Sequence, residues 1–203
     1  MFATIYLPNF YLQAATRHQP ELRAKPVALI DEKEAKAAIM QLNEAAEEAG
    51  VRKGMTPSQG LARCLSLLVK TRKHSQEKLI DKILLQYAFT LTPYVEASAP
   101  GVCTIQFNVG RQPSWLPGQT GCQALDLNGE DARLPRQTRC LSAKLARLIE
   151  QLADCDITAQ AGIAHLPDTS FLAAHLAHPV LQIDDAKAFL APLPIETLAI
   201  TFS

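Results

Sequence analysis

The chain has 203 residues, 48% of them hydrophobic, which is enough to bury the core of one domain or of two small lobes. Its 20 basic and 20 acidic side chains cancel, which argues against a histone-like or tail-driven nucleic-acid binder and leaves only a local basic patch. No apolar run approaches the length of a bilayer span and no signal-peptide pattern opens the chain, so we expect a soluble cytoplasmic protein with no membrane partner.

The first third of the chain predicts a small lobe of short elements. Apolar, β-branched runs at 3–7 and 27–30 are typical of strands, and a further apolar run follows at 37–42. Asn43 can cap a short helix that stops at Gly50. Thr56-Pro57-Ser58-Gln59 combines a capping box with a proline at the first helical position, so a second helix is expected from Pro57.

Two long amphipathic helices dominate the rest of the chain. Apolar residues recur at helical spacing over 75–91 and again over 136–152. Between them we expect a hairpin, a Gly/Pro-rich loop at 108–123 and a strand at 125–127. Strands at 158–163 and 180–183 and helices at 169–177 and from 185 complete the chain. The order predicts an α+β fold with a sheet covered on one side.

Taken in order, three local patterns resemble Y-family translesion DNA polymerases. The segment 43–55 is similar to the fingers motif, which ends in Gly-Val-[Arg/Lys]-x-Gly-Met, and 92–107 resembles the acidic hairpin. The segment 161–179 resembles the Val-Gly-Ile-Ser strand, its helix and the terminal Lys-Pro. More narrowly, the chain resembles the ImuB group, known as catalytically inactive accessory proteins of bacterial mutagenic repair in the SOS response to DNA damage.

This resemblance implies a palm with a mixed or antiparallel sheet covered by two long helices, and a small helical fingers lobe. It assigns 1–10 and 73–182 to the palm, 11–72 to the fingers and 183–203 to the start of a thumb. The rest of the thumb and the little finger are then absent.

The resemblance also locates the positions at which such polymerases hold two magnesium ions with three carboxylates. Leu7 stands at the first of them, and Asn9 at the second acidic position of the same strand. In an ungapped register Gly101 and Val102 replace the hairpin pair, and in a second register Gly121 and Cys122 do. Neither register supplies an oxygen ligand, so we expect no metal and no cofactor.

The resemblance also locates a triphosphate pocket, and there the chain lacks the side chains with which the family binds the nucleotide. Glu44 and Glu47 stand where the family has a Tyr and an Arg, Phe171 replaces a basic residue, and Leu12 replaces an aromatic ribose sensor. Carboxylates repel a triphosphate, so the resemblance predicts that the chain is not an enzyme. Alternatively, Glu44 and Glu47 simply belong to a solvated helix face.

Binding is the function that remains, and the basic residues are its candidates. The densest group lies in or next to the expected fingers and consists of Arg52, Lys53, Arg63, Lys70, Arg72 and Lys73. Such residues bind phosphates without sequence preference, which indicates weak DNA binding. A solvated lysine-rich loop explains them equally well. A second basic face comprises Arg136, Arg139, Lys144 and Arg147.

The family further implies three protein partners: the sliding clamp, a RecA-like ImuA-type protein and a replicative-type polymerase. Residues 123–127 faintly resemble a clamp-binding peptide. Two alternatives stay open. One is an active but divergent nucleotidyltransferase using Asp31, Glu96 or Asp126, and the other is a pure protein-interaction module. The five cysteines have no Cys-x-x-Cys pair and are expected as reduced thiols, and the histidines near 165–178 lack metal-site spacing.

Overall fold

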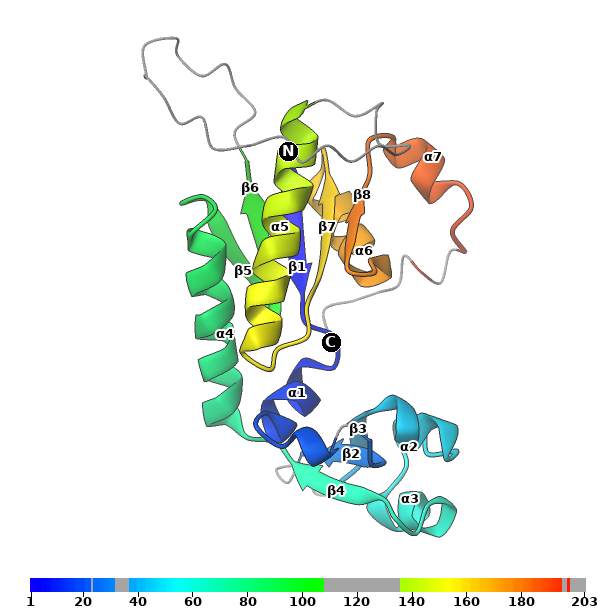
Figure 1. Ribbon diagram of the computed structural model, residues 1–203. Coiled ribbons are helices and arrows are strands. Elements are labelled where there is room, and N and C mark those ends of the chain that lie inside the picture. Colours follow the sequence, from blue (N-terminus) through cyan, green and yellow to red (C-terminus); the bar gives the residue numbers. More distant parts are fainter. Residues whose placement is uncertain (23, 32–36, 108–135, 195–196, 198–203) are drawn as a thin grey trace.

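The larger lobe is built on a five-stranded mixed sheet in the order β5-β6-β1-β7-β8 (Figure 1). The computed structural model describes residues 1–22, 24–31, 37–107, 136–194 and 197. Central strand β1 is antiparallel to both β6 and β7, and edge strand β8 is parallel to β7. The strands are β1 (Phe2–Tyr6), β5 (Val95–Ala99), β6 (Val102–Gln106), β7 (Gln160–Ala164) and β8 (Val180–Gln182).

Helices cover both faces of this sheet. On one face α4 (His74–Phe89) and α5 (Arg136–Asp154) form the main core with the alternate residues Ala3 and Ile5 of β1. On the other face lies α6 (Pro167–Leu176), where the Thr4 and Ser170 hydroxyls are hydrogen-bonded at 2.8 Å. The prediction of a sheet covered on one side is therefore wrong, although both long helices were predicted.

A glycine explains how α6 comes so close to the sheet. Gly162 lies opposite Thr4 on the α6 side of β7. A Cβ atom at this position would lie 2.3 Å from the backbone nitrogen of Ala174 and from the carbonyl oxygen of Ser170. Because these neighbours are backbone atoms, they cannot move aside as a flexible side chain can.

The smaller lobe contains a three-stranded sheet in the order β3-β2-β4, with β3 antiparallel and β4 parallel to β2. Asn43 caps α2 through Ala46, and Thr56 and Gln59 form the capping box predicted for α3. This lobe is thus not purely helical. The elements are α1 (Phe10–Thr16), β2 (Val27–Ile30), β3 (Ile39–Leu42), α2 (Glu44–Glu48), α3 (Pro57–Arg63) and β4 (Leu68–Thr71), with a 3-10 turn at Pro20–Leu22.

One guanidinium joins the two lobes. Arg72, just after β4, donates from Nε and Nη2 to the two carboxylate oxygens of Glu77 at 2.9 and 2.8 Å, in the first turn of α4. Its Nη1 contacts Asp31 at the end of β2 at 3.1 Å, and its Cζ lies 4.1 Å from the ring centroid of Tyr11 on α1. Burial alone would raise the pKa of Glu77, yet the hydrogen bonds and charge of Arg72 lower it.

A short helix, α7 (Ala186–Leu190), follows the sheet, and Asp185 caps it. The loop and strand expected at 108–127 lie outside the described residues. Among the described cysteines Cys64, Cys103 and Cys155 are free, but Cys140 is disulfide-bonded, contrary to the expectation of reduced thiols. None of the described helices is long and apolar enough to cross a bilayer.

We predict that Gly162→Ala lowers the free energy of unfolding by about 3 kcal/mol, because the new methyl group overlaps the α6 backbone. Urea denaturation measures this. Gly54→Ala is the matched control, because a Cβ atom at Gly54 would lie in open space. Gly54 has a φ of 85°, so we expect only conformational strain of about 1 kcal/mol from this substitution. Equal decreases in the two variants would contradict the close packing of α6.

We predict that Glu77→Gln lowers stability by about 2 kcal/mol at neutral pH, because it removes a charged partner of Arg72. Since the pKa of Glu77 is lowered by folding, its stabilising contribution is present above its unfolded pKa and is lost as pH falls through the folded pKa. Wild type and variant should therefore converge in acid, once the pH lies below the lowered pKa of Glu77. Glu150→Gln, at an exposed site on α5, should change little at either pH. A pH-independent difference for Glu77→Gln would refute the ion pair.

Candidate functional site

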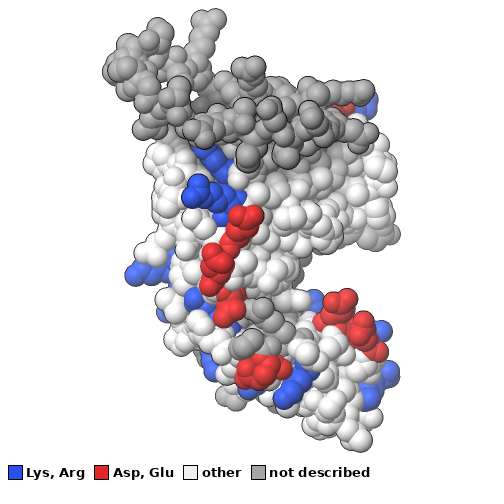
Figure 2. All heavy atoms as spheres, in the orientation of Figure 1, with Lys and Arg blue, Asp and Glu red and all other residues white. Residues whose placement is uncertain are grey.

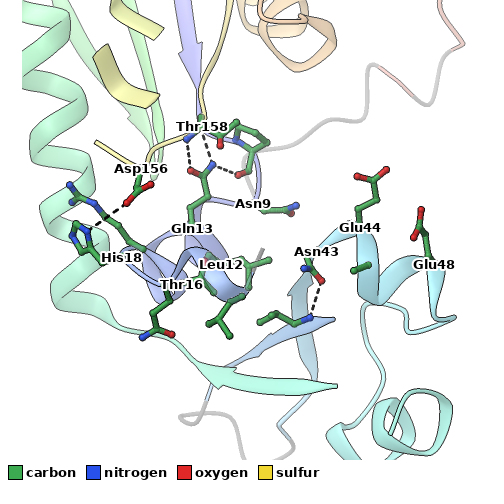
Figure 3. Close-up of a pocket in the computed structure, with 16 residues that line it drawn as sticks. Asn9, Leu12, Gln13, Thr16, His18, Asn43, Glu44, Glu48, Asp156 and Thr158 are labelled. Atoms are coloured by element: carbon green, nitrogen blue, oxygen red, sulfur yellow. Dashed lines mark hydrogen bonds and ion pairs between the residues drawn. The ribbon is translucent and has the colours of Figure 1, made fainter. Parts of the chain in front are cut away.

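A cleft of about 620 Å³ lies between the two lobes, where β1 passes into α1 (Figure 3). The loop before β7 forms its wall on the larger lobe, and α2 with the start of β2 forms the wall on the smaller lobe. In the described chain every non-glycine residue with a positive φ lines this cleft, namely Asn9, His18 and Asp156. Strained backbone of this kind is maintained by its surroundings and concentrates at functional sites.

Side chains of α1 attach the cleft floor to the loop before β7. Gln13 bonds Thr158 in both directions, donating to its carbonyl at 3.0 Å and accepting from its N–H at 2.8 Å. His18 lies 3.8 Å from the Asp156 carboxylate. Arg17 donates through Nε to the Cys155 carbonyl, while its Nη1 is buried without a partner among the described residues. The cleft therefore has a donor that a bound acceptor could satisfy.

Leu7 and Gly101, which stand where the resemblance locates carboxylates of the polymerases, lie next to each other in the structure. The Leu7 N–H donates to the Gly101 carbonyl at 2.9 Å, so the ungapped register places these positions side by side. Leu7 is 1% exposed and belongs to the main core, and Val102 is buried opposite Tyr6. The alternative pair, Gly121 and Cys122, lies outside the described residues.

One carboxylate reaches this turn, from α4 rather than from the sheet. Asp81 accepts a hydrogen bond from the Gly101 N–H at 2.9 Å. Burial raises its pKa, an effect that this hydrogen bond opposes. Gly101 itself has a φ of 71°, and a Cβ there would lie 2.6 Å from the Phe10 ring. No sequence pattern indicates this role for Asp81, because its partner lies twenty residues away on another element.

The donors at these positions do not fit a pair of magnesium ions. Magnesium requires oxygen ligands in near-octahedral geometry, and Leu7, Gly101 and Val102 carry none in their side chains. No group of three or more His, Cys, Asp or Glu side chains in the described ranges could hold a metal ion. We therefore derive no metal-dependent step from these residues.

The first turn of α1 receives its cap from β3 of the small sheet. Asn9 has a φ of 48° and makes no capping hydrogen bond, and its amide points to the Leu42 carbonyl at 3.5 Å. Gln41 of β3 instead accepts from the Leu12 N–H at 2.9 Å. Leu12 is buried and lines the cleft. Gln41 thus holds the backbone of Leu12, the residue at the expected ribose-sensing position. The sequence did not predict this contact.

The acidic residues of α2 face solvent around the cleft. Glu44 and Glu48 are exposed on its wall (Figure 3), and Glu47 lies in an adjoining depression with Arg52 and Lys53. Phe171 lies apart from these residues, on α6, with its ring centroid 4.4 Å from that of His175. The four positions expected around a triphosphate therefore do not form one cluster.

The candidate DNA-binding residues differ in their exposure and in whether their charged groups already have partners in the fold. Lys53, Arg63 and Lys73 are exposed, and Lys70 is half-buried on β4. Arg52 donates to the carbonyls of Glu47 and Val51, and Arg72 holds the lobe junction. In the view of Figure 2 basic and acidic side chains are interspersed rather than gathered in one patch. Lys144 and Arg147 of the second basic face lie on α5, and both are exposed.

The fold is similar to that of solved structures of DNA polymerases. DinB from Sulfolobus solfataricus matches with a TM-score of 0.71 and 14% identity, over 97% of this chain and 52% of that one. The insertion ternary complex of Dbh DNA polymerase matches with a TM-score of 0.73 and 12% identity, over 97% and 53%. These matches confirm the predicted α+β, Y-family polymerase-like fold. The chain spans about half the length of these structures, and no curated protein matches it.

A family match corrects the prediction that the chain is not an enzyme. Residues 5–175 match the impB/mucB/samB family, and its structural neighbours are polymerases. These matches are to polymerases, so the prediction that the chain is not an enzyme is contradicted, and the side chains of Leu7, Gly101 and Val102 do not establish inactivity. The chain belongs to the impB/mucB/samB family.

Proposed function

We propose that this chain is the palm and fingers portion of a polymerase-related protein that binds primed DNA during DNA repair and translesion synthesis, as a DNA-binding or scaffolding module. The observation that carries the proposal is the cleft between the two lobes, within a chain of the impB/mucB/samB family. Its polar floor and strained backbone are what a binding site requires.

The proposed domain borders follow the lobes. We assign 1–10 and 73–182 to the palm, 11–72 to the fingers and 183–203 to the start of a thumb. In support, the five-stranded sheet falls within the first assignment and the three-stranded sheet within the second. Arg72 and Glu77 pair across the border between them.

The proposed DNA contacts are the basic side chains that the fold leaves free. Lys53 and Arg63 are exposed on the smaller lobe, and Lys73 is exposed where α4 begins. We leave Arg72 out, because its guanidinium is occupied by Glu77 and Asp31. Few such contacts, on a chain with zero net charge, favour weak and salt-dependent binding.

Within the family we propose kinship with the ImuB group. Support comes from Leu7 and Gly101, which lie together as that resemblance expects. The partners that this kinship implies are the sliding clamp, a RecA-like ImuA-type protein and a replicative-type polymerase. The cytoplasmic location and the role in the SOS response stay predictions.

Salt-dependent binding to primed DNA is the test of the proposed function. We expect fluorescence anisotropy with a labelled primer–template to give a dissociation constant that rises with salt. The double variant Lys53→Ala/Arg63→Ala should lower the slope of log affinity against log salt by about 2, because each cation that no longer neutralises a phosphate lowers it by about 1.

Lys78→Ala/Lys82→Ala is the matched control, because it removes two exposed cations of α4 that do not line the cleft. This variant should bind as wild type does. An equal effect of both double variants would point to nonspecific charge attraction, and no binding at low salt would reject the proposed function.

Nucleotidyl transfer is the second candidate, favoured by the family to which the chain belongs. Glu96 is exposed on β5, Asp31 is paired with Arg72, and Asp126 lies outside the described residues. Single-nucleotide extension of a primer decides the question. Incorporation that requires magnesium and stops with chelator would establish this activity, whereas DNA binding without extension would leave the first candidate.

A further inference from the structure

Three aromatic rings lie in a row beside the end of the central strand, and two of them are stacked. The His175 ring lies 3.9 Å from the ring of Tyr6, centroid to centroid, with an angle of 23° between the planes. The ring centroid of Phe171 lies 4.4 Å from that of His175, and the planes of these two rings are tilted by 52°. All three side chains are half-buried, so the rings are supported by the fold and still reach the surface.

Two polar atoms of this stack have no hydrogen-bond partner within the described part of the chain: Nε2 of His175 and the Tyr6 hydroxyl. The Nδ1 atom of His175 lies 2.9 Å from the Phe171 carbonyl. Since a carbonyl only accepts, Nδ1 carries the proton and Nε2 of the neutral ring is an acceptor. Burial lowers the pKa of His175, which keeps the ring neutral at pH 7.

The stack borders a part of the sheet, on β5 and β6, that no helix of the described ranges covers on this face. Tyr6 and Thr4 face the α6 side, and α6 packs on β1, β7 and β8. Next to them on the same face, Thr104 of β6 is half-exposed, and Glu96 of β5 and Gln106 of β6 are exposed. A ligand lying on β5 and β6 would thus meet the rings at its edge.

We propose that Tyr6, His175 and Phe171 form a stacking platform for an unpaired or terminal nucleobase of DNA lying on this open face. The proposal rests on the proposed DNA binding. Aromatic rings stack on any base, because every base presents a π-face. Bases within a duplex are covered on both sides, so only an unpaired or terminal base has a face to offer.

The chemistry of the site favours a base over a phosphate. The rings carry no positive charge at neutral pH, and Glu96, two strands away on β5, repels phosphate oxygens on the same face. Nε2 of His175 can accept from an exocyclic amine, and the Tyr6 hydroxyl can donate to a base nitrogen or oxygen. The resemblance expects a phosphate-binding basic residue at the position of Phe171. An aromatic ring at that position can contact a base but cannot neutralise a phosphate.

Fluorescence of 2-aminopurine tests the platform in the full chain. The probes are primer–templates with this base either at the first unpaired template position or at the primer end. We expect wild type to quench one of the two at saturation. His175→Leu should abolish most of that quenching and bind the probe about tenfold more weakly. Phe171→Leu should act in the same direction, and urea unfolding of each variant verifies that it is folded.

Phe89→Leu is the control, because it removes an exposed ring from α4 on the opposite face of the sheet and should change nothing. Lys53→Ala/Arg63→Ala should weaken binding but keep full quenching at saturation. If folded His175→Leu binds and quenches as wild type does, the platform is overturned while DNA binding stands. If wild type binds neither probe at low salt, both proposals fail.

Discussion

The relation between the two lobes depends on the Arg72 guanidinium. It forms a two-pronged ion pair with Glu77 of α4, a third contact with Asp31 at the end of β2, and a cation–π contact with Tyr11 of α1. Because Arg72 and Glu77 are largely buried, removing either would leave an uncompensated charge. Together with the bonds from Gln13 and Arg17 to the loop before β7, this junction ties the walls of the cleft to each other.

The centre of the larger lobe is held by a backbone bond and by apolar burial. Leu7 and Gly101 are joined through their backbones, and Leu7 adds roughly 2 kcal/mol of apolar burial. Asp81 reaches the same turn from α4 and holds the Gly101 N–H. The geometry of the hairpin is therefore maintained by hydrogen bonds that do not require a metal.

The surfaces around this centre offer contacts of different chemistry. The cleft wall on α2 is acidic, the free cations lie on the smaller lobe and at the start of α4, and an aromatic stack flanks the open half of the sheet. A DNA strand with charged phosphates and flat bases can be held by the last two, while the acidic wall limits where its phosphates lie. This division agrees with a chain whose charges sum to zero.

The sequence by itself determined the long helices, the capping box at Thr56 and the hairpin, because periodicity, caps and turns are local properties. It missed α1, whose cap comes from Gln41, and the short strand β4, whose pairing depends on β2. Only the tertiary structure decided that α6 covers the second face, that Asp81 meets Gly101 and that Tyr6 stacks on His175. These contacts join residues up to 169 positions apart, and no local pattern encodes a partner at that distance.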